Sequence, residues 1–469
     1  MDQATIPAHV VLLSSPGMGH IIPLASLAVC LTRHHGLSVT LISNTIPSNQ
    51  QSLQDFLSFN QVKLIKLEEP NEPSPSSSNL NAESRIWQTI KSTMPHVHSK
   101  IKSIAKESHL SAIIFDPFYL DALDTAKELN IPCFLFFTTS CMALSFTFAL
   151  PGLDKQFQDQ SCDLPEPVQL PGCVPIRGID LPDTVQDRTN EMYKGFLSGI
   201  NRFKEVSGVL VNSYEELEPG PTKGLKEFKG MPHVYQVGPL IRTSLTTGPG
   251  QGKECLRWLD RQPQGSVVFV SFGSGGTLMW QQTKELALGL EMSEQQFLWV
   301  ARYPNEKESS AYYFGSKDMQ GQLNFLPEGF LTRTEKVGLV VPHWAPQVEI
   351  LAHPAVGGFM THCGWNSVLE SLVHGVPLIT WPLFAEKKMN AVLLTEDVKV
   401  AIRPKQDGSA MISRDEVSRV VRCLMKGKDA ERLKQRAQEL SREAVNTLEG
   451  GSSYKNLLQV TNLWKNSVV

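Results

Sequence analysis

Residues 355–377 constrain the fold more than any other stretch of the chain. They begin with a short apolar run, residues 355–361, which is typical of a buried strand. A tight turn follows, then two helix-capping residue types, Asn366 and Ser367, and a predicted helix over 368–374. A helix that begins just beyond a buried parallel strand directs its free N–H groups away from the sheet. The stretch therefore predicts an α/β fold with an anion site, and phosphate is the usual anion.

Two further turns flank this site, and each follows a predicted strand. The sequence WAPQ, residues 344–347, follows the strand 337–341, and the sequence WPLFAEK, residues 381–387, follows the strand 376–380. In an open parallel sheet, turns at the carboxyl ends of the strands share one crevice in which ligands bind. The segment thus predicts an aromatic ring, a phosphate cradle and polar groups along one extended ligand.

These turns lie in a stretch of 44 residues, 344–387, that resembles the signature box of the plant family 1 UDP-sugar-dependent glycosyltransferases. Its WAPQ, HCGWNS and GVP…WP elements stand in that family's register, and the rest of the chain also fits the family from end to end. The resemblance implies the α/β fold called GT-B, which is two facing Rossmann-like, doubly wound domains with a C-terminal helix that returns to the first domain.

The predicted domains follow from the alternation of strands and helices in each half. Residues 1–241 form an N-terminal acceptor-binding domain, and residues 242–252 are a polar, Gly-rich linker. Residues 253–450 form a C-terminal UDP-sugar-binding domain, and residues 451–469 form the returning helix. The chain of 469 residues is too long for one ordinary core, which agrees with two domains.

Composition excludes several classes of protein. The net charge of −3 and the absence of a long basic run disfavour a nucleic-acid or anionic-membrane partner. No run of 18 apolar residues exists, so we expect no membrane span. The eight cysteines are scattered without paired spacing, which favours reduced thiols and a cytoplasmic location. We expect a monomer.

The first predicted strand, residues 9–15, leads into a turn that ends at His20. A dinucleotide fingerprint would need glycine at position 22, which is Ile22, so a nicotinamide or flavin enzyme is disfavoured. The resemblance implies that His20 is the catalytic base, and imidazole suits proton removal at neutral pH. It also implies that Asp116, after the strand 110–115, pairs with His20 and fixes its tautomer. From the residues alone, Asp116 could instead be only an N-cap, and His20 a helix-start residue.

The donor site is carried over position by position from the box. The resemblance implies that Trp344 stacks on uracil, that Ala345 and Gln347 contact the base and ribose, and that Glu370 binds the ribose hydroxyls. It also implies that His362, Asn366 and Ser367 bind the diphosphate, and that Trp365 and Glu386 contact the sugar. Ser274 lies in a second Gly-rich turn, residues 272–277, which predicts the other side of the diphosphate site. Two structural alternatives remain, a core role for Trp344 and a helix capping box formed by Ser367 and Glu370.

Lys387 departs from the family box, in which glucose users carry Gln at this position. Lysine only donates hydrogen bonds and adds a charge. The alternatives are that Lys387 turns toward solvent or pairs with Glu386, leaving glucose as the donor sugar, or that it redirects donor choice to galactose or glucuronate.

The implied reaction is inverting transfer from UDP-glucose to a hydroxyl of a small aromatic acceptor of the phenol, phenylpropanoid or indoxyl type. No Asp-x-Asp motif occurs, so we expect no metal and no cofactor; His362 and the helix N-terminus would supply the charge at the diphosphate. The acceptor candidates are Glu83, Phe118, Tyr119 and Phe146, although aromatics such as Phe146 are more often core. Other possible functions are a non-catalytic sugar-nucleotide-binding protein and a sugar-nucleotide epimerase.

Overall fold

The computed structural model describes residues 8–44, 51–67, 82–157, 164, 166–241, 252–306, 309–310, 323–408 and 410–466. Most of the predicted linker and much of the predicted polar insertion at 303–325 lie outside these ranges. The chain divides into two compact units. Unit 1 comprises Met1–Pro175, Thr184–Leu245 and Asn446–Val469, and unit 2 comprises Ile176–Asp183 and Thr246–Val445.

Unit 1 contains a seven-stranded parallel sheet in the order β3-β2-β1-β4-β5-β6-β7. Its strands are β1 (His9–Ser14), β2 (Ser38–Ser43), β3 (Lys63–Lys66), β4 (Leu110–Phe115), β5 (Cys133–Phe137), β6 (Gly208–Val211) and β7 (Val234–Gln236). The strand order reverses between β1 and β4, and the turns that follow these two strands therefore meet at one edge of the sheet.

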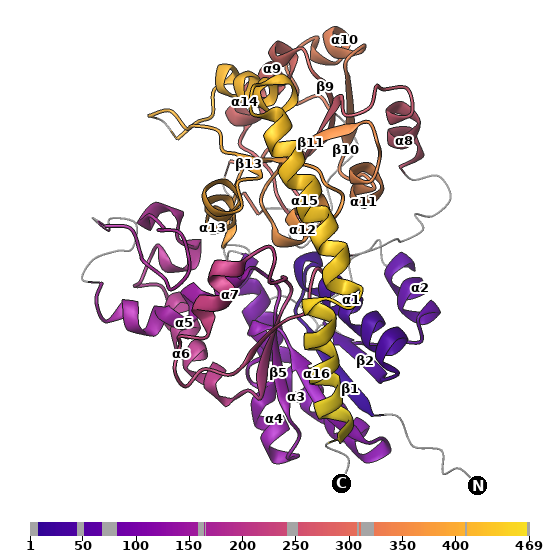
Figure 1. Cartoon of the computed structure of the whole chain (residues 1–469), viewed down its shortest axis with the longest axis vertical. Helices are drawn as coiled ribbons and strands as arrows, with labels where there is room; N and C mark the ends of the chain where they lie inside the picture. Colours follow the sequence, from indigo (N-terminus) through magenta and orange to yellow (C-terminus); the bar gives the residue numbers. More distant parts are fainter. Residues whose placement is uncertain are drawn as a thin grey trace. The chain divides into compact units, whose positions relative to one another are not determined.

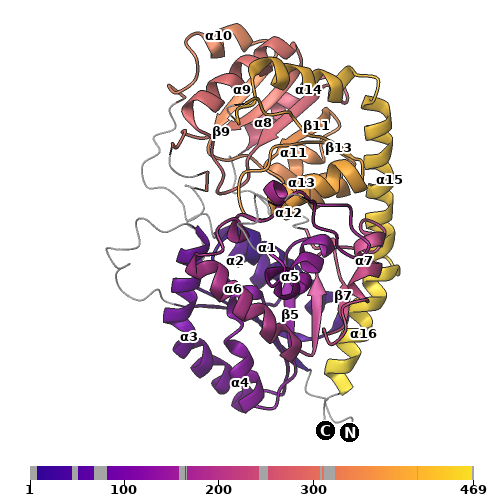
Figure 2. The same cartoon turned by 90° about the vertical axis from the view of Figure 1, so that its left-hand side faces the viewer.

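Helices cover this sheet. They are α1 (Met18–His35), α2 (Gln51–Phe59), α3 (Ala82–Glu107), α4 (Ala122–Glu128), α5 (Cys141–Asp154), α6 (Glu191–Arg202), α7 (Pro219–Leu225) and α16 (Ser452–Asn466). Figure 2 shows α3 and α4 side by side. The C-terminal helix α16 packs on unit 1, as Figure 1 shows in yellow, and the Trp464 ring lies edge-on to Phe134 with 5.3 Å between ring centroids.

Unit 2 repeats the pattern with six parallel strands in the order β10-β9-β8-β11-β12-β13. They are β8 (Val267–Ser271), β9 (Gln296–Ala301), β10 (Gly338–Pro342), β11 (Val356–Thr361), β12 (Leu378–Thr380) and β13 (Ala401–Ile402). The helices are α8 (Lys253–Leu259), α9 (Trp280–Ser293), α10 (Phe330–Thr334), α11 (Gln347–Leu351), α12 (Trp365–Val373), α13 (Lys387–Val392), α14 (Arg414–Lys426) and α15 (Ala430–Leu448), the last of which continues into unit 1.

Both sheets are doubly wound, and β8 and β11 are the counterparts of β1 and β4. The predicted α/β class with Rossmann-like sheets is therefore confirmed. Within the described ranges, no helix is long and apolar enough to cross a membrane.

Two expectations about local structure are wrong. Helix α12 begins at Trp365 rather than at 368, and its N-cap residue is Gly364. Ser367 consequently lies inside the helix and cannot form the capping box with Glu370 that the sequence allowed. Second, Ile176–Asp183 belongs to unit 2, although its place in the chain put it in a first domain spanning residues 1–241.

Candidate active site

His20 and Asp116 meet at the edge of the unit 1 sheet where β1 and β4 end. Because β1 and β4 are hydrogen-bonded neighbours, the turns that follow them are adjacent. The Nδ1 atom of His20 lies 3.2 Å from Oδ2 of Asp116, although the two atoms are not aligned as a hydrogen bond. The His20 side chain is 15% exposed and that of Asp116 is fully buried. A reactant can thus reach the imidazole but not the carboxylate.

The Asp116 carboxylate is fixed by three donors. Its Oδ2 accepts the Ser15 N–H at 2.7 Å, and its Oδ1 accepts the Ser15 hydroxyl at 2.5 Å and the Phe118 N–H at 3.1 Å. The last bond caps the short 3₁₀ segment Pro117–Tyr119, so the N-cap role and the contact with His20 occur together. Ser15 was not among the predicted site residues, although its position at the end of β1 is a usable signal.

The predicted acceptor residues have different environments. Phe118 is half-buried and meets His20 edge-on, with 5.5 Å between ring centroids. Tyr119 is fully buried and its hydroxyl donates to Asn44 at 2.8 Å, and Phe146 lies in the buried part of α5. Tyr119 and Phe146 are therefore part of the hydrophobic core of unit 1. Glu83 is half-buried in the first turn of α3.

In unit 2 the imidazole of His362 lies between two glycines, one from each predicted phosphate-binding turn. A Cβ atom at Gly273 would lie 2.4 Å from the ring, and one at Gly364 would lie 2.5 Å from it. Gly273 also has φ +73°, a region that favours glycine. The Gly-rich turn after β8 and the turn after β11 are therefore in contact, which is what a shared diphosphate cradle requires. Ser274 is exposed at this turn and Asn366 is half-buried at the start of α12.

Burial, together with the positive charges of Lys387 and Arg302, lowers the pKa of His362 well below its usual value. The neutral form of the imidazole is therefore favoured at pH 7. The neutral imidazole can donate an N–H hydrogen bond to an anion, and the charge that the sequence assigned to His362 at the diphosphate stays a prediction.

The predicted base- and ribose-binding residues lie together at the start of α11 and along α12. The Gln347 amide donates to Ser367 Oγ at 2.9 Å and to Glu370 Oε2 at 2.6 Å. Trp344 is 40% exposed after β10, which argues against a core role, whereas Ala345 is buried. Unit 2 thus presents an exposed aromatic side chain three residues before Gln347, which in turn orients the Glu370 carboxylate.

The predicted sugar-contacting residues are buried or half-buried in unit 2. Trp365 is buried, and Glu386 is half-buried as the N-cap residue of α13. Lys387 is only 7% exposed; its ammonium donates to the Phe384 carbonyl at 3.2 Å and lies 3.5 Å from the centroid of the Phe384 ring. Lys387 therefore does not turn toward solvent.

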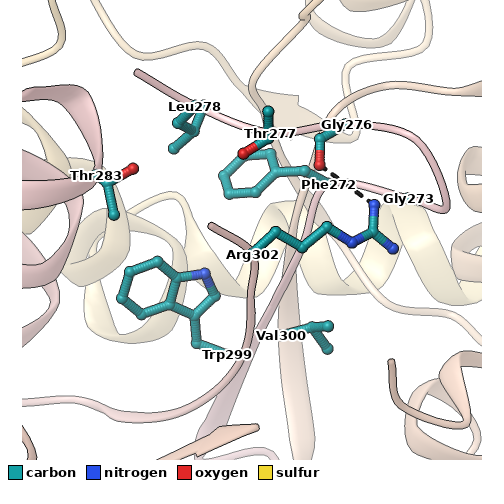
Figure 3. A pocket seen from close by; sticks show the side chains of 9 residues that line it. All are labelled: Phe272, Gly273, Gly276, Thr277, Leu278, Thr283, Trp299, Val300 and Arg302. Atoms are coloured by element: carbon teal, nitrogen blue, oxygen red, sulfur yellow. Dashed lines mark hydrogen bonds between the residues drawn. The ribbon is translucent and has the colours of Figure 1, made fainter. Parts of the chain in front are cut away.

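Arg302 was missed by the sequence reasoning. It follows β9 and joins two predicted donor-binding turns by hydrogen bonds to main-chain carbonyls. Its guanidinium donates to Gly276 at 3.2 Å and to His343, next to Trp344, at 3.3 and 3.2 Å. Figure 3 shows Arg302 reaching Gly276 beside a small pocket that Trp299 helps to line. The partners are 26 and 41 residues away in the chain, so no local sequence signal marks this link.

No group of three or more His, Cys, Asp or Glu side chains suited to a metal occurs in the part of the chain that the structure describes.

The family model for UDP-glucoronosyl and UDP-glucosyl transferase matches residues 243–441.

Full-length relatives are also found. The chain is 45% identical over 467 residues to the hydroquinone glucosyltransferase of Rauvolfia serpentina, with 98% of each covered. It is also 45% identical over 475 residues to UDP-glycosyltransferase 72B1 of Arabidopsis thaliana, with 99% of this chain and 98% of that one covered.

Solved structures agree with this relationship. A complex of 3,4-dichloroaniline with a Polygonum tinctorium UDP-glucosyltransferase capable of glucosylating indoxyl has a TM-score of 0.88 at 43% identity, covering 98% of this chain and 99% of that one. Phytolacca americana UGT2, complexed with UDP-2fluoro-glucose and pterostilbene, has a TM-score of 0.88 at 40% identity, covering 98% of this chain and 100% of that one. The fold is GT-B, and the chain belongs to the plant family 1 UDP-glycosyltransferases.

Proposed function

We propose that this glycosyltransferase moves glucose from UDP-glucose to the hydroxyl of a small aromatic acceptor, with inversion, to give a β-glucoside. The acceptor would be a phenol, a phenylpropanoid alcohol or indoxyl. The observation that carries the proposal is the contact of 3.2 Å between the accessible His20 imidazole and the buried Asp116 carboxylate. A protein that only binds a sugar nucleotide has no need for such a pair.

In the proposed reaction, Asp116 faces Nδ1 of His20 and favours the tautomer with the proton on that atom. The Nε2 atom is then the basic nitrogen, and it takes the proton of the acceptor hydroxyl. The acceptor oxygen forms its bond to the anomeric carbon while the bond to the UDP oxygen breaks on the opposite face. Asp116 stabilises the imidazolium that results, and the three donors that hold its carboxylate keep it in place.

The donor site would use residues that unit 2 already orients. Trp344 would stack on uracil, with Gln347 and the Ala345 backbone at the base and ribose. Glu370 would accept the ribose hydroxyls, since a carboxylate accepts several hydrogen bonds. The leaving diphosphate would receive N–H donors from His362 and the start of α12, where Gly364 has no side chain to satisfy those groups. Asn366, Ser367 and Ser274 would complete this site.

Several observations support a small aromatic acceptor. The relatives include proteins named for hydroquinone and indoxyl, and one structural neighbour holds pterostilbene. In unit 1, the half-buried Phe118 ring beside His20 offers an apolar face to a flat ring.

The seven described cysteines are all free thiols, which supports the reducing cytoplasm as the compartment.

A second candidate donor, UDP-glucuronate, is suggested by the buried ammonium of Lys387, which could pair with a sugar carboxylate. Its hydrogen bond to the Phe384 carbonyl favours glucose, because that bond directs the charge back onto its own loop.

The decisive experiment is mass spectrometry of the products formed from mixed UDP-sugars and mixed phenols, with NMR of the anomeric proton. We expect β-glucosides. Predominant glucuronides or galactosides would overturn the assignment of the donor, and α-linked products would overturn inversion. If UDP-glucose binds without transfer to any acceptor, the non-catalytic alternative holds.

A further inference from the structure

The loop that ends at Glu386, together with Lys387 and Lys388 at the start of α13, is held by a segment from the other half of the chain. Residues Ile176–Asp183 are preceded and followed in sequence by unit 1, yet they form part of unit 2. The segment contains the 3₁₀ turn Gly178–Asp180, and a second 3₁₀ turn, Asp183–Val185, begins at its last residue. The segment lies outside the signature box, residues 344–387, but it contacts the part of the box that carries Glu386 and Lys387, the proposed sugar-binding residues.

Asp180 anchors this segment to the edge of the unit 2 sheet. Its carboxylate is 2% exposed and accepts from Arg403, which follows β13, at 2.6 Å. Arg177 donates to the other oxygen at 2.8 and 2.9 Å. A buried carboxylate with two guanidinium partners is well compensated, so the segment has a fixed attachment point.

Asp183 then pairs with the loop itself. Its Oδ2 accepts the Ala385 N–H at 3.0 Å, and its own N–H donates to the Ala385 carbonyl at 3.4 Å. Its Oδ1 accepts from the Lys388 ammonium at 3.0 Å. Ala385 has φ +57°, which an alanine rarely adopts, so the surroundings must hold this conformation. Glu386 and Lys387 lie between the two residues that Asp183 binds.

We propose that Asp183 is a positioning residue for the donor sugar. By holding Ala385 and Lys388 it sets the direction in which Glu386 and Lys387 project. The main-chain bonds matter most, because the Asp183 and Lys388 side chains are 38% and 29% exposed and their ion pair is weakened by solvent. This inference rests on the proposed contact of Glu386 and Lys387 with the sugar of UDP-glucose.

The test separates sugar recognition from nucleotide binding. In Asp183→Ala, we expect the KM for UDP-glucose to rise about tenfold, with kcat reduced, while the Kd of free UDP measured by calorimetry changes by less than about twofold. Discrimination between UDP-glucose and UDP-galactose should narrow as well. Lys388→Met, which removes only the ion pair and leaves the main-chain bonds to Ala385, should have a smaller effect of the same kind.

The matched control is Asp187→Ala. This nearby carboxylate lies in unit 1 and bonds locally to Thr189, so the variant removes the same charge without touching the loop. Asp183→Asn keeps an acceptor for the Ala385 N–H, so its KM for UDP-glucose should lie between those of the parent and Asp183→Ala. This variant also keeps the test possible if Asp183→Ala does not fold. Unchanged KM in both Asp183 variants, or equal losses for UDP-glucose and free UDP, would overturn the inference. If the parent itself transfers no glucose, the proposed function fails instead.

Discussion

Each unit places a histidine at the point where its strand order reverses, but the two histidines have opposite surroundings. In unit 1, His20 follows β1 and faces the carboxylate of Asp116. In unit 2, His362 follows β11 and lies between glycines, near the positive charges of Arg302 and Lys387. The two histidines follow strands on opposite sides of the reversal point, since β1 corresponds to β8 and β11 to β4. Their surroundings suit different chemistry, that of the proposed base in unit 1 and that of a buried N–H donor in unit 2.

The turns after β1 and β8 explain part of this difference. After β1 only three residues precede α1, so His20 sits in the first turn of the helix, directly over the sheet edge. After β8 eight residues precede α9, and the Gly-rich backbone itself approaches the partner turn. A short turn places a side chain at the crevice, whereas a long glycine turn offers main-chain groups.

The largest effect should come from His20→Ala. Removing a general base lowers turnover by roughly 10²-fold or more, while UDP binding, which unit 2 provides, stays nearly intact. The measurement is kcat on a phenol with a pKa near ~10, together with calorimetry of UDP. The loss should be milder on acidic phenols, which ionise without help. Equal turnover by variant and parent on the weakly acidic phenol would remove His20 from the mechanism.

The next largest effect should come from Gly273→Ala. The added Cβ would lie 2.4 Å from the His362 ring at a residue with φ +73°, so the cradle must deform. We expect UDP to bind at least about tenfold more weakly. Gly19→Ala is the matched control in unit 1, because its Cβ would have open space around it and should leave UDP affinity unchanged. Equal UDP affinity in the parent and Gly273→Ala would mean that the two turns do not form one site.

The free energy of unfolding should depend on pH in a way that shows whether His362 is a buried neutral imidazole. The pKa of His362 in the folded chain is lowered, so its contribution to stability is present above the unfolded pKa of about 6.5 and is lost as the pH falls. Below that pH the unfolded state binds the proton more readily, which lowers the free energy of unfolding by up to about 1.4 kcal/mol per pH unit. Urea unfolding of the parent and His362→Gln between pH 7 and 5 should show a shallower decline in the variant. Parallel curves would contradict a neutral His362.

Lys387→Gln should change donor affinity more modestly. Gln both donates and accepts, so we expect UDP-glucose to bind up to roughly tenfold more tightly, with little change for free UDP. UDP-glucose should already be the best donor of the parent. A parent that prefers UDP-glucuronate or UDP-galactose would refute this.

Excess chelator should have the smallest effect, because we expect no change at all in the initial rate of glucosyl transfer. The proposed charge at the diphosphate comes from protein groups, so the initial rate should not change. A large loss that magnesium or manganese restores would show that the helix N-terminus and its neighbours are insufficient.

The sequence predicted the sheets best where strands are continuous apolar runs. The interval predicted for β4 matches the observed strand, and that for β1 differs by one residue. It missed β3, whose four residues KLIK at the sheet edge are not fully buried and show no apolar run. It also missed β9, although residues 297–301 are a continuous apolar run. The helix before it ends at Glu294 in a left-handed conformation, so no glycine marks the boundary between helix and strand.

The box residues could be listed from the sequence because their spacing is local, and the structure brings Gln347, Ser367 and Glu370 into direct contact. Arg302 and Asp183 could not be found in this way. Their partners lie 26 to 205 residues away, and arginine and aspartate on a surface loop carry no periodic or turn signal of their own.

The packing of α16 has a consequence for how the chain is made. Leu457, Val460 and Trp464 are part of the unit 1 core, alongside residues of β1 and α1. During synthesis, these side chains emerge only after unit 2 has been translated, so the first unit to leave the ribosome is the last to close its apolar face. Until then that face is available to chaperones or to wrong partners, and truncation of α16 should harm yield in cells more than a surface helix of its length would suggest.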